Sequence, residues 1–266
     1  MSPTLTRSDW NGLLKDRRPT APDVELKATL QKSSEGGSGA FLGLADDRQR
    51  YWIKTINNAQ GERVPITEQI VGRIGSLINA PTCSVKTIGI DANFVGWEFK
   101  SGNKLEQGIA HASLHVEDAV LNRALDHRSD DDNVRRRAFI FALYDWCWGG
   151  DIQGLLEASN KNTFYSHDHG WYLPPNGAQW NIAELEDKVD TPHEMQKNDD
   201  GKVQSVAEEI AVAIEAVQKE EILEALSCIP STWPVSDDEL ECVGFFLEKR
   251  TTAVAERIRM RFRRSQ

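Results

Sequence analysis

Apolar and polar residues alternate along three short runs near the start of the chain. The runs cover residues 24–30, 40–45 and 51–56. Alternation with a period of two is typical of a strand that buries one face. A segment rich in glycine and serine, 33–39, separates the first two runs, and the polar turn 46–49 separates the last two. The pattern therefore predicts an antiparallel meander of three strands.

The spacing of apolar residues changes to that of a helix from Thr67 onward. Apolar residues three and four positions apart share one helix face, and Pro65 stands just ahead, where a helix start tolerates proline. These apolar positions are Ile70, Val71, Ile74, Leu77 and Ile78. After a stop at 79–81, the segments 84–90 and 94–100 read as two further strands. The first hundred residues are therefore predicted to be β-rich with one helix.

The polar segment 101–104 marks a change, because the composition after it favours helices. We predict a lobe boundary there, with an N-terminal lobe at 1–101 and a C-terminal lobe at 102–266. The helices expected in the second lobe are 116–126, 134–148, 203–228 and 237–263. A hairpin-like run is expected at 163–173, between the second and the third of these helices. The predicted fold class is α+β with two lobes, one β-rich with a single helix and the other mainly helical.

The bulk composition is that of a folded protein with an acidic surface. Hydrophobic residues make up 39% and charged residues 27% of the 266 positions, which are values of globular and not of disordered chains. The net charge of −10 argues against binding to nucleic acid or to an anionic membrane, because either would need a basic surface. Arginines gather at 257–264, but a helix spreads them over several faces. We interpret them as a solvated helix end that complements the helix dipole.

The cysteines and the apolar runs bear on the compartment. The four cysteines are scattered, and none lies at the spacing of a metal site. No apolar run reaches the length of a membrane span, and residues 1–16 lack the apolar core of a secretion signal. We therefore expect a reduced, cytoplasmic protein with no membrane attachment.

The glycines between the first two predicted strands, Gly36, Gly37 and Gly39, would let backbone amides approach phosphate groups. Lys54 lies in the strand about fifteen residues later, and Glu68 lies one turn into the following helix. In kinases a glycine-rich loop, a strand lysine and a helix glutamate follow in this order, and the glutamate holds the lysine against the phosphates. Each feature alone also fits a flexible hairpin, a solvated lysine or a glutamate at a helix start. The ordered set favours the phosphate site.

Two aspartates in the second half complete a kinase-like pattern. Asp151 follows Gly149-Gly150 at the end of an apolar helix, and Asp168 follows the strand-like run 163–166 with Gly170 two residues later. In kinases the first acid orients or deprotonates the acceptor hydroxyl, and the second holds Mg²⁺ against the nucleotide phosphates. The pattern therefore predicts a phosphotransfer site with Asp151 as its acid/base and Asp168 as its metal ligand.

The histidines on either side of Asp168 raise an alternative, a transition-metal site. His167 and His169 would share one face of an extended run while Asp168 points away from them. No His-Glu-x-x-His pattern accompanies them, and the chain contains no Gly-x-Ser-x-Gly turn of a serine hydrolase. We therefore interpret both histidines as framework.

Taken together, these residues resemble the HipA-like kinases. The similarity covers about Glu25 to Trp180 and is most specific at the sequence SHDHGWYLP, which starts at Ser166. It is nearest to compact bacterial and phage-type members that carry Asp-His-Gly in place of Asp-Phe-Gly. The resemblance implies a two-lobed fold related to protein and phosphoinositide kinases, with ATP and Mg²⁺ bound between the lobes. It also implies transfer of phosphate to serine or threonine hydroxyls of a protein substrate, and an antitoxin-like protein partner.

The resemblance assigns roles to residues at matching positions. Lys54 would contact the phosphates, and Glu68 would anchor Lys54. Asp151 would be the catalytic acid/base, and Asp168 would ligate Mg²⁺. The hinge that meets adenine is expected at Glu98–Ser101.

The chain departs from the family at the catalytic loop, which usually reads Asp-x-x-x-x-Asn. The fifth residue after Asp151 is Leu156, whose side chain cannot bind Mg²⁺. Gln153 is the nearest amide that could take the second metal position, although placing it in register would put Trp148 at the acid position. Two alternatives follow, a pseudokinase that binds nucleotide or serves as a scaffold, and a kinase of small molecules or lipids. Further amides that could replace the asparagine are Asn160 and Asn162.

Overall fold

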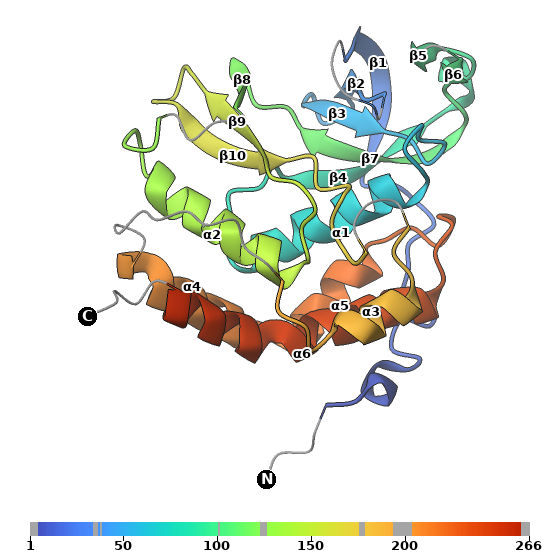
Figure 1. The fold of residues 1–266 in the computed structure, drawn as a ribbon. Coiled ribbons are helices and arrows are strands. Elements are labelled where there is room, and N and C mark those ends of the chain that lie inside the picture. The colour runs from blue at the N-terminus through green and yellow to red at the C-terminus, as the bar shows by residue number, and fades with distance from the viewer. Residues whose placement is uncertain are drawn as a thin grey trace.

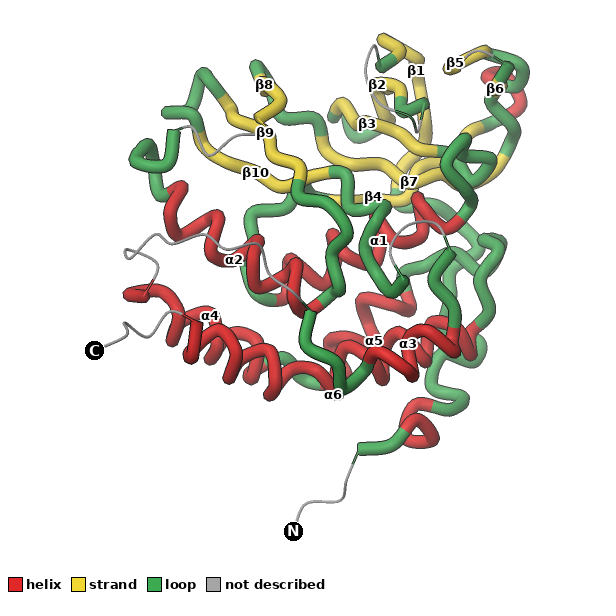
Figure 2. The backbone as a smooth tube through the Cα atoms, viewed as in Figure 1, coloured by secondary structure: helices red, strands yellow, loops and turns green. Residues whose placement is uncertain are grey.

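The computed structural model describes residues 5–33, 37, 39–100, 102–122, 127–175, 179–193 and 204–261. A β-barrel and a second, smaller sheet lie side by side above a layer of helices (Figures 1 and 2). This arrangement is the α+β fold predicted from the sequence, with a β-rich N-terminal part and a helical C-terminal region.

The barrel has the strand order β1-β2-β3-β7-β4 and closes through a parallel pairing of β1 with β4. The other neighbours pair antiparallel. The strands are β1 (Val24–Lys32), β2 (Phe41–Ala45), β3 (Arg50–Lys54), β4 (Val85–Ile90) and β7 (Gly108–Leu114). The predicted three-stranded meander is thus present as β1, β2 and β3.

The alternating pattern exists because one face of each strand fills the barrel. Ile53 and Phe41 are fully buried inside it, while Trp52, between two buried residues of β3, is partly exposed. The aromatic rings of Trp97 and Phe99 close one end of the barrel by packing against Phe41, with ring centroids 5.1 and 6.0 Å away. Each inward side chain therefore contributes to a core separate from that of the helices.

Helix α1 (Arg63–Leu77) begins four residues before the predicted start and takes Pro65 into its first turn, where proline removes no helical hydrogen bond. It packs against β4 and β7 on one side and against α5 (Lys219–Ser227) on the other. Because both sides are covered, even its polar residues Thr67, Glu68 and Gln69 are buried.

The N-terminal sheet extends past residue 101, where we predicted the lobe boundary. The polar segment interpreted as a linker belongs to a small hairpin of β5 (Glu98–Lys100) and β6 (Asn103–Lys104), with Gly102 at φ +80° in its turn. The chain then returns as β7, which pairs with β3 and β4. A tight polar turn and an interdomain linker have the same composition, so the sequence did not separate them. The connection to the second sheet is 115–118.

The second sheet has the antiparallel order β10-β9-β8. Its strands are β8 (Ala119–Asn122), β9 (Gln153–Glu157) and β10 (Thr163–His167). The prediction of a helix at 116–126 is wrong for the described residues, because Ala119–Asn122 pairs with β9 as an edge strand. Val120 and Leu121 are both exposed, so the alternation that marks a half-buried strand is missing there.

The helical layer consists of helices from the second half of the chain. The predicted helix at 203–228 is two helices, because Gln218 starts a new one with a capping box to Glu221. No described helix is both long and apolar enough to cross a lipid bilayer. The helices of this layer are α2 (Asn133–Trp146), α3 (Ile182–Lys188), α4 (Gln204–Ala216), α5 and α6 (Asp237–Arg261), and short 3-10 turns lie at Arg7–Trp10 and Ala92–Phe94.

Candidate active site

Lys54, the last residue of β3, lies at the centre of a buried charge cluster. Its side chain is 9% exposed, and its Nζ atom donates hydrogen bonds to a carboxylate oxygen of Glu68 and, at 2.6 Å, to Oδ1 of Asp168. These residues come from a barrel strand, a helix and the loop after β10. The structure therefore brings Asp168 together with Lys54 and Glu68, the two residues that the sequence analysis predicted to pair.

Glu68 is held by the C-terminal half of the chain as well as by Lys54. Its Oε2 atom accepts a hydrogen bond from the backbone N–H of His169 at 3.1 Å. One residue earlier, the hydroxyl of Thr67 accepts a hydrogen bond from the indole N–H of Trp180 at 2.9 Å. Helix α1 is thus fixed to the second half of the chain at the turn that carries Glu68.

The loop after β10 turns sharply at Asp168, whose φ of +57° lies in the left-handed region. The hydroxyl of Ser166 and Nε2 of His169 form a hydrogen bond of 2.8 Å across the turn. Gly170 must be glycine, because a Cβ atom there would lie 2.6 Å from a methyl group of Val64 in α1. The Asp-x-Gly pattern is therefore what lets α1 approach the loop this closely.

The Lys54 ammonium supplies the positive charge of this cluster, and the two carboxylates that it contacts have different pKa values. Burial lowers the pKa of Lys54, but the Glu68 and Asp168 carboxylates outweigh this effect and raise it above its ordinary value. Burial raises the pKa of Asp168, but the Lys54 ammonium outweighs it and holds that pKa well below its usual range. Burial raises the pKa of Glu68 to about 7, despite the same ammonium. Asp168 therefore keeps its charge through the Lys54 ammonium, and its side chain is 27% exposed, against 4% for Glu68.

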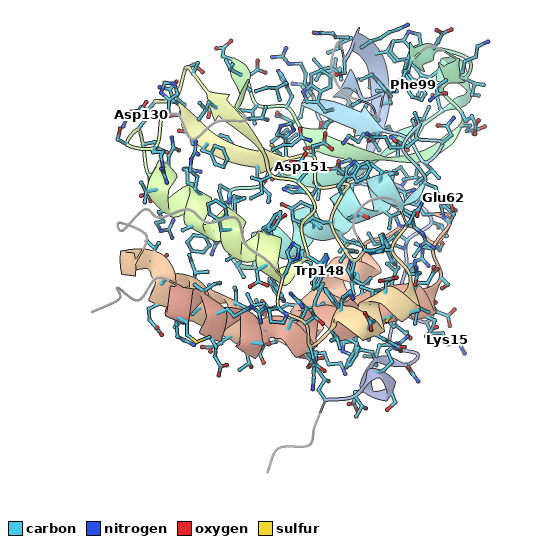
Figure 3. The ribbon with its side chains drawn as sticks, in the orientation of Figure 1. Lys15, Glu62, Phe99, Asp130, Trp148 and Asp151 are labelled. Carbon is cyan, nitrogen blue, oxygen red and sulfur yellow. The ribbon has the colours of Figure 1, made fainter. Side chains whose placement is uncertain are left out.

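Asp151 is exposed in the loop after α2, near the middle of the molecule (Figure 3). Oδ2 of Asp151 accepts a hydrogen bond of 3.0 Å from the Gln153 amide. Gln153 begins β9 and pairs with His167, the residue before Asp168. The two loops therefore meet at Gln153, which is hydrogen-bonded to Asp151 and paired with the residue before Asp168. Leu156, by contrast, is buried on the other face of β9.

The expected phosphate loop is described only in part. Gly36 lies outside the described residues, whereas Gly39 adopts a left-handed φ of +68°. A Cβ atom at Gly39 would lie about 3 Å from the Lys100 side chain, whose ammonium donates to the carbonyl oxygen of Gly37. The β5–β6 hairpin therefore packs against the end of this loop.

The segment expected to form the hinge, Glu98–Ser101, does not join the two sheets. Glu98 is exposed in β5, and Ser101 lies outside the described residues. Because β7 is inserted between this hairpin and the second sheet, the backbone that joins the two sheets is 115–118, not Glu98–Ser101. Recognising this would have required pairing β7 with β3 and β4, which no local pattern reveals.

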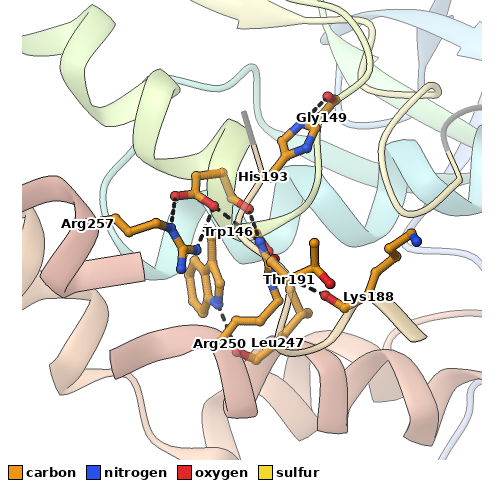
Figure 4. A network of polar contacts seen from close by, with 9 residues as sticks. Trp146, Gly149, Lys188, Thr191, His193, Leu247, Arg250 and Arg257 are labelled. Carbon is orange, nitrogen blue, oxygen red and sulfur yellow. Dashed lines mark hydrogen bonds and ion pairs between the residues drawn. The ribbon is translucent and has the colours of Figure 1, made fainter. Parts of the chain in front are cut away.

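A second polar network supports the start of the Asp151 loop (Figure 4). Asp145 in α2 is fully buried and forms ion pairs with Arg250 and Arg257 of α6, at 3.1 and 2.8 Å. Arg250 also donates to the carbonyl oxygens of Lys188 and Thr191. This pairing joins segments about a hundred residues apart, and the sequence analysis did not predict it.

His193 connects this network to the loop itself. Its Nε2 atom lies 2.7 Å from the carbonyl oxygen of Gly149, two residues before Asp151. The imidazole stacks against the rings of Tyr144 and Trp148, with ring centroids 4.9 and 4.5 Å away. This hydrogen bond thus attaches the backbone before Asp151 to a segment that follows α3.

The histidines beside Asp168 form no metal cluster. In the part of the chain that the structure describes, no group of three His, Cys, Asp or Glu side chains is placed to hold a metal ion. Burial lowers the pKa of His167 to about 4 and that of His169 to about 3, so both rings are neutral at physiological pH.

A sequence model of a family described as HipA-like kinase matches residues 26–265. The chain belongs to the HipA-like kinase family. Among solved structures it is similar to the Helicobacter pylori proinflammatory kinase CtkA, at 10% identity and a TM-score of 0.52, over 91% of this chain and 96% of that one. It is also similar to the Golgi casein kinase, at 8% identity and a TM-score of 0.43, over 95% of this chain and 76% of that one. No curated protein sequence matches it.

At 10% identity the similarity to CtkA concerns the fold alone, and it extends over nearly the whole length of CtkA.

Proposed function

We propose that this HipA-like kinase transfers the γ-phosphate of ATP to serine or threonine hydroxyls of a protein, with Mg²⁺ as the metal. The observation that carries the proposal is the buried cluster of Lys54, Glu68 and Asp168. A buried lysine that pairs with two carboxylates contributes little to the stability of the fold, because the cost of removing the three charged groups from water offsets most of their attraction. Its use is to present an ammonium and a carboxylate to a nucleotide.

The nucleotide lies between the barrel and the second sheet in this proposal. Lys54 contacts the phosphates, Glu68 holds Lys54, and the backbone of Gly37 and Gly39 covers the phosphates from the barrel side. The base lies against the connection 115–118, which takes the place of the hinge expected at Glu98–Ser101.

The residues present fit a magnesium ion. Asp168 and Gln153 offer carboxylate and amide oxygens, which are the donors that Mg²⁺ prefers. The absence of a three-residue cluster in the described part of the chain is consistent with magnesium, which typically takes one or two carboxylates and completes its shell with phosphates and water. Held by Asp168 and Gln153, the ion would supply positive charge opposite the phosphates.

Asp151 is the group that meets the acceptor. It is exposed, so the hydroxyl of a folded protein can reach it, and its carboxylate accepts the hydroxyl proton. The hydrogen bond from Gln153 orients this carboxylate. A small acceptor fits the same residues, while the net charge of −10 disfavours an anionic membrane lipid. An antitoxin-like protein is the partner that the family suggests.

A second candidate, a pseudokinase, rests on the spacing of the loop. Gln153 is the second residue after Asp151, whereas the amide of the usual loop is the fifth residue after the acid. Such a protein would bind Mg·ATP through Lys54 and Asp168 and transfer nothing.

Transfer of radioactive phosphate from [γ-³²P]ATP to the protein itself, or to a cell extract, tests the choice. We expect labelling by the wild type, a loss of at least about 100-fold in Lys54→Ala and Asp168→Ala, and full activity in Lys27→Ala, an exposed lysine of β1. Calorimetric titration with Mg·ATP separates the candidates. Binding without any labelling would establish the pseudokinase, and absence of binding would refute both.

A further inference from the structure

His167 has a buried ring nitrogen without a partner, at the edge of the proposed nucleotide site. Its Nε2 atom is shielded from solvent and forms no hydrogen bond with any residue that the structure describes. His169, two residues later, differs, because its ring is bonded to Ser166. A buried polar atom without a partner is uncommon in folded proteins and calls for an explanation such as a missing ligand.

The side chain of His167 lies on the face of β10 opposite to that of Phe164 and Ser166. Phe164 and Ser166 of the same strand are buried, while Tyr165 and His167 are partly exposed, so the two pairs lie on opposite faces. Residues directly opposite each other in an antiparallel pair share a face, and His167 is opposite Gln153.

The same face carries the proposed chemistry. The Gln153 amide bonds to Asp151. His167 also directly precedes Asp168, whose carboxylate pairs with Lys54. The ring with the unpartnered nitrogen is therefore carried by a residue that adjoins Asp168 in the chain and stands opposite the partner of Asp151.

The charge balance of the site favours a neutral donor here. Of the charged residues named at the site, Asp151, Asp168 and Glu68 are carboxylates and Lys54 is a cation. A triphosphate entering such a site needs further hydrogen-bond donors, and a histidine N–H supplies one without adding a buried charge. No other role for this ring is visible among its described neighbours.

We propose that His167 is a nucleotide-binding residue whose Nε2–H donates a hydrogen bond to a phosphate oxygen of the bound nucleotide. The inference rests on the proposed nucleotide site but not on phosphate transfer. It predicts that the ring contributes to ligand binding and contributes nothing to the stability of the free protein.

Calorimetric titration with Mg·ATP, Mg·ADP, AMP and adenosine tests it in three variants. In His167→Leu, which keeps similar volume and removes both ring nitrogens, we expect about 10- to 100-fold weaker binding of Mg·ATP, the effect of losing a hydrogen bond to a charged group. In His167→Gln, whose amide N–H reaches a similar position, binding should stay within about threefold. His127→Leu, an exposed histidine bonded to Asp130, is the matched control and should bind as the wild type does.

The melting temperature without ligand should not fall together with the affinity for Mg·ATP, so it provides a second test. Without ligand, His167→Leu should melt at the same or a higher temperature, because the substitution removes an unpaired buried polar atom. With Mg·ATP its ligand-induced rise should be smaller than that of the wild type. Adenosine, which has no phosphate, should bind both proteins equally.

Three results would overturn the inference: unchanged Mg·ATP affinity in His167→Leu, an equal loss for adenosine, or a marked drop in the melting temperature without ligand. A wild type that binds Mg·ATP but labels no protein would refute the proposed kinase activity and leave this inference standing. A wild type that binds none of the four ligands would overturn both.

Discussion

Replacing Glu68 by glutamine should make the protein more stable at neutral pH and less active. Glu68 and Asp168 share a single ammonium, and Glu68 is the more deeply buried of the two. Because burial raises the pKa of Glu68 from 4.5 to about 7, the folded protein binds this proton more tightly than the unfolded chain does. The stability that this protonation contributes is complete below pH 4.5 and is lost as the pH rises through 7.

The magnitude follows from the size of the shift. Each unit of pKa corresponds to about 1.4 kcal/mol, so a rise from 4.5 to about 7 is worth about 3 kcal/mol. Glutamine resembles the protonated glutamate at every pH. Glu68→Gln should therefore match the wild type at pH 4.5 and exceed its free energy of unfolding by up to about 3 kcal/mol at pH 8.

Urea denaturation of both proteins between pH 4.5 and 8 measures this difference, with Glu62→Gln as the control. Glu62 is exposed just before the same helix, and its replacement should change the free energy of unfolding by less than about 0.5 kcal/mol throughout. A difference between Glu68→Gln and wild type that does not vary with pH would refute the reasoning. So would a variant less stable than the wild type at pH 8, because the Lys54–Glu68 pair would then be net stabilising.

Two further predictions concern the network beneath the Asp151 loop. Asp145→Asn should lower the free energy of unfolding by about 3–5 kcal/mol in urea denaturation, because the guanidinium groups of Arg250 and Arg257 lose their buried counter-charge. A loss below about 1 kcal/mol would show that other groups neutralise the arginines. His193→Ala should reduce kcat about 10- to 100-fold with KM for ATP within about twofold, because it frees Gly149 and the loop beyond it but touches no proposed nucleotide contact. Equal changes in both constants would instead indicate a general loss of structure.

The sequence was informative where a function depends on residues within one element or on the order of elements. Lys54 and Glu68 were predicted to pair because a strand lysine and a helix glutamate follow the glycine-rich segment in the order seen in kinases, and their hydrogen bond is present. Asp168 could be placed because the Asp-x-Gly spacing reports a local turn, and that turn requires Gly170.

Contacts that depend on the packing of distant segments could not be predicted. His193 reaches Gly149 across 44 residues, and nothing around either residue marks them as partners. The connection 115–118 was missed for a related reason. A strand reveals its buried face by alternation, but its neighbours in the sheet are chosen by the whole fold, and β7 joins two strands that precede it.

The burial of Leu156 changes the meaning of the missing asparagine. Counted along the sequence, Leu156 occupies the position of the second metal ligand and suggests a damaged site. In the structure it lies in β9 opposite Phe164, and both side chains are buried away from the charged cluster. The residue of β9 beside Asp168 is Gln153, because its partner His167 is the neighbour of Asp168. We therefore propose that the departure is a shorter loop that brings an amide next to Asp151, and not the replacement of a ligand by leucine. In this proposal both acids, an amide and an anchored lysine remain at the site, which supports the active kinase over the pseudokinase.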